Sequence, residues 1–163
     1  MVDDLISITT KLRGPFSTGA LAGLVATVPM TIFMLLMQRL LPKWQKYALP
    51  PEQITDEMAK RTDMKKNMDK QERVGTALLA HLGYGASMGV LYSRFSQRIP
   101  LPAALRGIVF GLIVWVGSYL GLLPALQMSE AAPEEPLRRN LLMIAAHVVW
   151  GASLGVTENF LAR

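Results

Sequence analysis

Four stretches of this 163-residue chain contain no charged residue, and they lie at 19–37, 74–92, 107–128 and 141–157. Each stretch approaches the roughly 20 residues that an α-helix needs to cross about 30 Å of hydrocarbon. Most of the charge falls between the stretches, as expected when every backbone amide in lipid is hydrogen-bonded within its own helix. The pattern predicts an all-α integral membrane four-helix bundle, with a soluble bundle of buried helices as the alternative.

Prolines and possible helix caps set the expected limits of these helices. We expect transmembrane helices at 15–41, 74–95, 103–128 and 138–161, and a charged interfacial loop and helix at 42–73. The net charge of +5 lies largely beside the spans, where Lys and Arg bind anionic lipid headgroups. Membrane lipids are therefore expected partners. Nucleic acid is not expected, because no basic patch carries interleaved aromatic residues.

The chain contains an internal repeat. The ten residues from His81 to Val90 return, with conservative changes, as His147 to Val156, 66 residues later. A glycine pair four residues apart recurs as well, in the first and third helices. The offset between these two pairs exceeds the 66 residues of the first repeat by 22. The difference places an insertion in the first interhelical loop. We therefore expect two repeated transmembrane hairpins with pseudo-two-fold symmetry about an axis along the membrane normal.

Small residues four apart mark the predicted helix-packing faces. In lipid, such faces allow close approach of helix backbones, which gains van der Waals contact where no hydrophobic drive exists. Because the repeat places equivalent glycines on the second and fourth helices, we expect these two helices to meet along one seam. Gly117 and Gly121 offer a further close-packing face on the third helix. The glycines predicted to pack are Gly19, Gly23, Gly85, Gly89, Gly107, Gly111, Gly151 and Gly155.

His81 and His147 occupy equivalent positions in two spans and are candidate functional residues, because an ionisable side chain in lipid is costly. In a structural interpretation, each imidazole donates to a carbonyl, to Ser87 or Ser153, or to the Tyr84 hydroxyl, and fixes the register of the bundle. This interpretation requires no cofactor.

Two other interpretations of the histidines stay open. In the first, His81 and His147 ligate one haem b from opposite sides, and the glycines make room for the porphyrin. In the second, the histidines line a polar path for protons or a small solute, together with Ser87, Ser153 and Glu158, and the protein acts as an oligomer. Glu158 lies near the end of the fourth helix and is expected to reach the headgroup region.

Two common signatures of soluble enzymes are absent from the sequence, which contains no phosphate-binding loop and no H-E-x-x-H. The absence of cysteine excludes disulfides and thiolate metal sites. Two histidines without neighbouring acids do not make a catalytic metal site, because three protein ligands are usual. We therefore expect a non-enzymatic structural or accessory protein that forms a homo-oligomer or joins a larger membrane complex.

Two strings carry a resemblance to a known family. Leu49-Pro-Pro-Glu-Gln-Ile-Thr55 follows the first predicted helix, and Ala80-His-Leu-Gly-Tyr-Gly-Ala-Ser-Met-Gly89 lies in the second. With these strings the chain resembles small uncharacterised bacterial inner-membrane proteins of YagU-like type. The resemblance implies a multi-pass protein of the bacterial cytoplasmic membrane with no established activity, and it transfers no catalytic residue.

Overall fold

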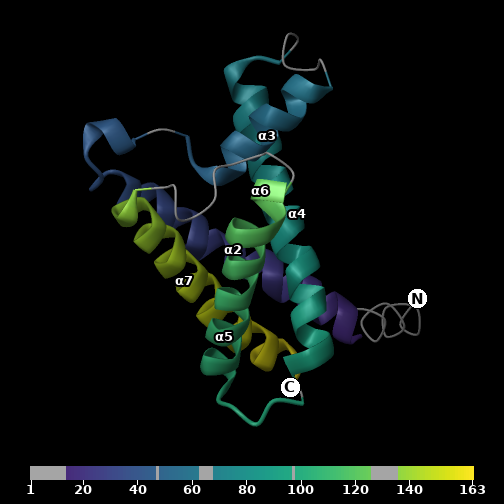
Figure 1. Cartoon of the computed structure of the whole chain (residues 1–163). Coiled ribbons are helices and arrows are strands. Elements are labelled where there is room, and N and C mark those ends of the chain that lie inside the picture. The colour runs from purple at the N-terminus through teal and green to yellow at the C-terminus, as the bar shows by residue number, and fades with distance from the viewer. Residues whose placement is uncertain (1–13, 47, 63–67, 97, 126–135) are drawn as a thin grey trace.

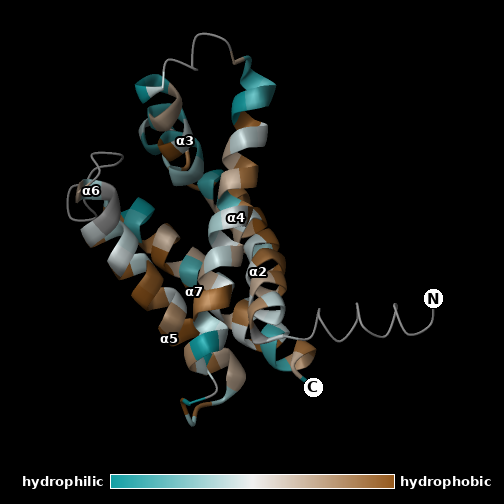
Figure 2. Ribbon diagram, turned by 90° about the vertical axis from the view of Figure 1, so that its right-hand side faces the viewer, coloured by the Kyte–Doolittle hydropathy of each residue, from teal (hydrophilic) through white to brown (hydrophobic). Residues whose placement is uncertain are grey.

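The computed structural model describes residues 14–46, 48–62, 68–96, 98–125 and 136–163. The described residues are helical, with no strand among them. Four helices are long and apolar enough to cross a membrane, which confirms the prediction of an all-helical membrane protein. Figure 2 shows the apolar residues concentrated on these long helices, and hydrophilic residues on the short helix α3 and at the start of α4.

The first hairpin is formed by α2 (Pro15–Gln38) and α4 (Lys70–Ser96), and the second by α5 (Ala103–Val116) and α7 (Leu137–Leu161). Pro15 occupies the first turn of α2, where its missing N–H costs no hydrogen bond. After α5 the third span continues as the π-helical segment η3 (Gly117–Leu122) and the short helix α6 (Leu123–Ala125). Residues 126–128, predicted to complete this span, lie outside the described residues.

The connection between α2 and α4 contains its own helices. A short 3₁₀ helix, η1 (Lys43–Gln45), is followed by α3 (Pro50–Arg61), whose prolines occupy its first turn. Figure 1 shows α3 at the upper end of the bundle, whereas α7 ends at the lower end. Arg139, at the start of α7, is 2% exposed and holds this connection by donating to the backbone oxygens of Gln45 and Ala48 (3.4 and 2.7 Å).

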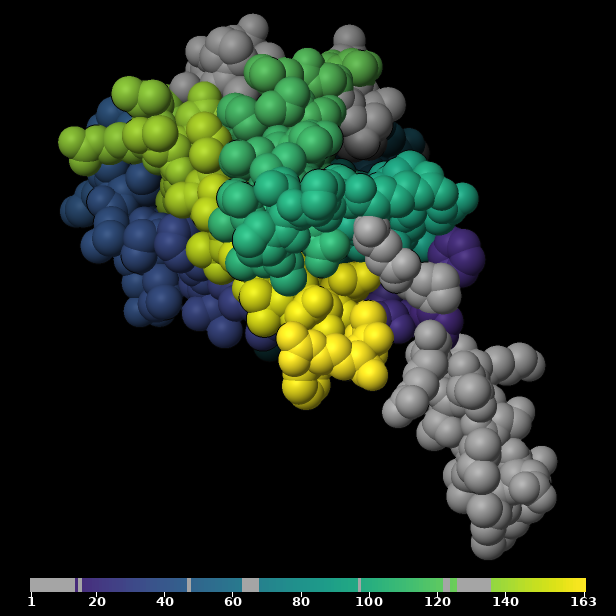
Figure 3. All heavy atoms as spheres, turned by 90° about the horizontal axis from the view of Figure 1, so that it is seen from below, coloured from purple at the N-terminus to yellow at the C-terminus, as the bar shows by residue number. Residues whose placement is uncertain are grey.

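Within each hairpin, glycines bring the two helices into backbone contact. A Cβ on Gly23 of α2 would overlap the carbonyl oxygen of Gly85 on α4, and one on Gly89 would overlap the carbonyl oxygen of Gly19. In the second hairpin, a Cβ on Gly107 of α5 would overlap the carbonyl oxygen of Gly151 on α7. Figure 3 looks onto the lower end of the bundle, where the end of α7 lies beside the start of α5.

These contacts correct the predicted pairing of the second and fourth helices. The glycine face of α4 packs against α2, and that of α7 packs against α5, so α4 and α7 do not share a seam. The two hairpins meet instead through an extensive contact between α2 and α7, whereas α4 and α5 touch over a short stretch only. The bundle is therefore closed on its α2–α7 side and open between α4 and α5.

Candidate functional site

A cavity of about 280 Å³ lies between the two hairpins, and both histidines line it. Its walls come from all four spans: Thr27, Met30 and Met34 of α2, Tyr84 and Gly85 of α4, Val114 of α5, and Trp150 of α7 are among the residues that line it. Ser118 and Tyr119 of η3 contribute as well. Side chains of α3 also line the cavity, so the connection between α2 and α4 contributes to the site directly.

His147 is held by its own helix. Its side chain is 7% exposed, and Nδ1 lies 2.8 Å from the carbonyl oxygen of Met143, one turn earlier. The ring of Tyr119 meets the imidazole edge-on, with centroids 5.9 Å apart. A carbonyl oxygen only accepts hydrogen bonds, so Nδ1 is the donor and carries the proton. The structural interpretation of this histidine, with its donation to a carbonyl, therefore fits the geometry.

His81 is half-buried and contacts the opposite helix of its hairpin. Its Nδ1 lies 3.3 Å from the hydroxyl oxygen of Thr31 on α2. Thr31 donates its own hydrogen to the carbonyl oxygen of Thr27 at 2.8 Å. The Thr31 hydroxyl is therefore left to accept from His81, since a hydroxyl has one hydrogen. Ser87 and Tyr84 were expected from the sequence as possible partners of His81, but the contact is with Thr31.

Thr27 links three helices at the floor of the cavity. It is fully buried, and its hydroxyl donates to the carbonyl oxygen of Gly23 at 2.8 Å. The same oxygen accepts the indole N–H of Trp150 from α7 at 3.2 Å. It is also the atom that a Cβ on Gly85 of α4 would overlap. The absence of a side chain at Gly85 thus makes room for the hydroxyl that joins the two hairpins.

Tyr84 reaches across the side of the bundle where α4 and α5 diverge. Its hydroxyl lies 3.0 Å from the hydroxyl oxygen of Ser118 in η3. In a π-helix the backbone is wider than in an α-helix, and such segments occur frequently at functional sites. Ser118 and Tyr119 are buried on the inner side of η3, whereas Gly117 and Gly121 are exposed on its outer side.

Within the described residues of this chain, the residues of the predicted polar path do not come together. Ser87 is exposed and donates to the carbonyl oxygen of Gly83 in its own helix (2.9 Å), and neither Ser87 nor Ser153 lines the cavity. Glu158 does not reach the headgroups as expected, because it is 4% exposed and accepts a hydrogen bond from Ser96 at 3.3 Å. Ser96 comes from the end of α4, so this buried pair joins the two hairpins near the lower end.

Aromatic side chains fill the space between the cavity and Glu158. Trp150 and Phe110 have ring centroids 6.2 Å apart, and Phe110 and Tyr92 have centroids 5.3 Å apart. Tyr92 is 2% exposed and lies within electrostatic range of Arg106 and Glu158. Arg106 donates to the carbonyl oxygen of Ser96 at 2.8 Å. The histidine cavity and the Glu158 pair are therefore separate polar sites with an aromatic column between them.

Three groups of residues at the cavity were not predicted from the sequence. Thr27 and Thr31 stand four apart in α2, a spacing that could have signalled a polar face. Ser118 lies in a segment with no local signal for a π-helix. The α3 residues Pro50, Pro51 and Ile54 were assigned to the membrane interface, and nothing in their pattern indicates that they line a cavity between the spans.

The volume of the cavity bears on whether a haem could lie between the two histidines. Sites that bury drug-sized molecules measure roughly 300–1,000 Å³, and this cavity lies below that range at about 280 Å³. A porphyrin with its substituents is larger than the ligands of the smallest such sites. A cavity of about 280 Å³ therefore does not favour a haem between the two histidines. Among the described residues, no three His, Cys, Asp or Glu side chains gather as a metal site.

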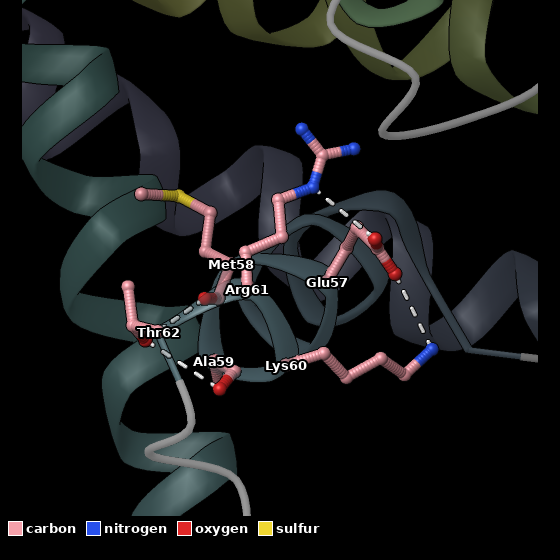
Figure 4. A network of polar contacts seen from close by, with 6 residues as sticks. All are labelled: Glu57, Met58, Ala59, Lys60, Arg61 and Thr62. Carbon is pink, nitrogen blue, oxygen red and sulfur yellow. Dashed lines mark hydrogen bonds and ion pairs between the residues drawn. The ribbon is translucent and has the colours of Figure 1, made fainter.

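Outside the spans, α3 carries a polar network at its end. Glu57 accepts hydrogen bonds from Arg61 Nε at 3.2 Å and from Lys60 Nζ at 3.3 Å (Figure 4). These contacts, first with Arg61 and then with Lys60, lower the pKa of Glu57 below its ordinary value of 4.5. Thr62 closes the helix by donating to the carbonyl oxygen of Met58 at 2.9 Å. Acids early and bases late along α3 also suit the helix dipole.

The four spans and the cavity between the two hairpins define a small multi-pass membrane protein. The chain belongs to the family described as a protein of unknown function (DUF1440), which matches residues 30–156. The matched region includes α3, both histidines and the second hairpin as far as Val156. Comparison with curated proteins and with solved structures returns no match.

Proposed function

We propose that this protein is a non-enzymatic structural or accessory component of the bacterial cytoplasmic membrane. In this proposal it packs with a second copy of itself or with another subunit of a larger complex. The observation that carries the proposal is the outer face of α5 and η3. Gly117 and Gly121 stand four apart there, and a Cβ on either would meet none of the described residues within 4 Å.

Large apolar side chains surround these two glycines. Ile113, Val116 and Leu120 are 61%, 47% and 50% exposed, and their spacing of three and four residues places them along the same side as Gly117 and Gly121. We call these five residues the open glycine face. The glycines of the hairpin seams all meet a neighbouring helix closely, whereas these two meet no helix in the part of the chain that the structure describes. Small residues beside apolar ones are the usual contact between membrane helices, because backbones can approach closely there.

The repeated architecture supports the proposal. The contact between Gly23 and Gly85 in the first hairpin has its counterpart between Gly111 and Gly151 in the second, where a Cβ on Gly111 would lie 3.2 Å from the Gly151 Cα. We infer that the hairpins derive from one duplicated unit. We place the protein in the bacterial inner membrane on the basis of the YagU-like resemblance. The seam glycines already contact a neighbouring helix of the same chain, so the open glycine face is available to a partner.

Neither alternative finds comparable support. A conduit for protons or solutes needs a continuous polar path, and the aromatic column of Trp150, Phe110 and Tyr92 lies between the cavity and Glu158. A haem needs a wider cavity than about 280 Å³. The absorption spectrum of protein purified gently from its native membrane, oxidised and dithionite-reduced, tests the haem alternative. We expect no Soret band.

Cross-linking in native membranes tests the proposal. The chain has no cysteine, so Gly121→Cys introduces a single thiol on the open glycine face. We expect oxidation to give a disulfide-linked dimer, or a thiol-to-amine cross-linker to give one discrete heavier product. Leu79→Cys is the control, because Leu79 is 71% exposed on α4 away from this face. Products from neither reagent at position 121, or equal products at both positions, would contradict the proposal.

A further inference from the structure

The two histidines that line the cavity use the same ring nitrogen for their hydrogen bonds. Hydrogen bonding assigns the proton of His147 to Nδ1, which donates to the Met143 carbonyl, and that of His81 to Nδ1, which donates to Thr31. In a neutral imidazole the other nitrogen is then an acceptor. Within the part of the chain that the structure describes, Nε2 of neither ring has a hydrogen-bond partner. The cavity is therefore lined by two imidazoles, one from each hairpin, that each keep one acceptor nitrogen.

The remaining polar groups of the cavity are largely satisfied. Thr27 donates to Gly23 and accepts from Trp150, and Thr55 donates to the carbonyl oxygen of Pro51 at 2.7 Å. Tyr84 and Ser118 share one hydrogen bond. Most of the other wall is apolar, with Met30, Met34, Ile54 and Val114 among its members. A molecule that fits here has an apolar body and offers hydrogen-bond donors to the two Nε2 atoms.

We propose that the cavity binds a small aromatic ring with two hydroxyl groups, a compound of the hydroquinone class that dissolves in the bilayer. Each hydroxyl donates to one histidine Nε2, and the ring contacts methionine sulfur and aromatic edges, which favour such faces. An apolar cavity of about 150 Å³ accommodates benzene, so about 280 Å³ leaves room for a substituted ring. This binding goes beyond the accessory role proposed above and does not depend on it.

The shape of the protein supports a site for a bilayer-soluble molecule. The cavity reaches the side of the bundle where α4 and α5 have little contact, which faces lipid in a membrane, and the hydroxyls of Tyr84 and Ser118 join α4 to η3 there. At the upper end Pro50, Pro51 and Ile54 of α3 cover it. These residues lie in the connection that is longer in the first hairpin than in the second. The segment that departs from the repeat thus supplies part of the binding site.

Nuclear magnetic resonance of the whole protein in lipid nanodiscs tests the proposal. With ¹⁵N-labelled histidine the chain gives signals from two imidazoles only. We expect both Nε2 signals to be those of unprotonated nitrogen, and both to shift saturably on titration with anaerobic methylhydroquinone. Its dimethyl ether, which has the same ring but no donor, should leave them in place. Protonated Nε2 in the free protein, unmoved signals, or equal shifts with the ether would overturn the proposal.

Variants give a second readout. His147→Phe keeps an aromatic ring but removes the acceptor, and we expect it to weaken methylhydroquinone binding at least about tenfold. Ser87→Ala, on the lipid-facing side of α4, should bind as the wild type does. If folded His147→Phe binds with unchanged affinity, the assignment of this nitrogen is wrong. If His147→Phe does not fold, the comparison of methylhydroquinone with its ether on the wild-type protein decides the question.

Discussion

The indole nitrogen of Trp150 donates to the hydroxyl of Thr27 at 3.2 Å, across 123 positions of the sequence, and so joins α7 to α2. Thr27 in turn occupies the space left by the missing side chain of Gly85. One hydroxyl thus connects the seam inside the first hairpin with the contact between hairpins. The histidine cavity is built on this connection, because Thr27, Gly85 and Trp150 all line it.

Replacing Thr27 by Val should leave the buried Trp150 N–H without an acceptor. Val matches the shape of Thr, so the lost hydrogen bond dominates the effect. Hydrogen bonds between membrane helices average about 0.6 kcal/mol and reach about 1.7 kcal/mol, and we expect a loss near the upper figure because the donor is buried. Unfolding in mixed micelles measures it. Thr76→Val, an exposed threonine bonded to its own helix, is the control and should have no effect. Equal stabilities of the two variants would refute the role of Thr27.

Glycine substitutions should separate seam positions from open positions on the same helix. Gly85→Leu places a side chain against Thr27, whereas Gly83→Leu enters open space two residues away. Overpacking costs roughly 1–3 kcal/mol and more where backbone must move, so we expect Gly85→Leu to lose at least about 3 kcal/mol and Gly83→Leu almost nothing. Gly151→Leu should behave like Gly85→Leu. The close seams would be disproved by detergent stabilities that stay at the wild-type value in both seam variants.

Arg139 should anchor the connection between α2 and α4. Hydrogen bonds from a charged donor contribute about 1.5–3 kcal/mol, and Arg139 donates to two carbonyl oxygens of that connection. We expect Arg139→Met to lower stability by about 2 kcal/mol and to speed proteolysis within residues 42–49. Its neighbour Arg138 is exposed, so Arg138→Met should change neither. If proteolysis of the two variants proceeds alike, Arg139 is not the anchor.

The end of α3 should respond to acid through Glu57. The pKa of this carboxyl is lowered chiefly by Arg61, so its contribution to the stability of α3 is present above the ordinary pKa of 4.5. It is lost as the pH falls through the lower, folded pKa. Titration of the Glu57 carboxyl carbon by nuclear magnetic resonance should give a pKa below 4.5, raised in Arg61→Gln and less so in Lys60→Gln. A wild-type value at or above 4.5 would contradict the network.

The positions of the spans were predictable, because uncharged runs of about 20 residues have few alternatives to crossing a membrane. The third span differs in its local geometry, since it becomes π-helical at Gly117, where the sequence carries no signal. The glycine periodicity predicts close-packing faces; the eight seam glycines contact a neighbouring helix, whereas Gly117 and Gly121, predicted as a further close-packing face, contact none of the described residues. The periodicity could not identify the partner helix, because spacing along a chain defines a face and says nothing of what lies opposite. Hence α4 was expected against α7 and packs against α2.

The site was predictable in its histidines but not in its surroundings. The repeat predicts an equivalent depth for His81 and His147, and both line one cavity. Their partners Thr31 and Met143 depend on rotamers and helix rotation, which periodicity does not specify. Glu158 was expected at the headgroups because it stands near the end of a span. Its burial depends on Ser96, 62 positions earlier in the chain, and such distant pairing needs the folded structure.

The central claim is that the open glycine face binds a protein partner in the membrane. Native mass spectrometry of complexes released directly from membrane vesicles tests it. The account predicts that the wild-type chain is released as a dimer, or bound to one other subunit in fixed ratio, and that Gly117→Leu with Gly121→Leu is released as a folded monomer. A wild-type chain released only as a monomer with lipid, or a double variant with unchanged partners, would contradict the claim.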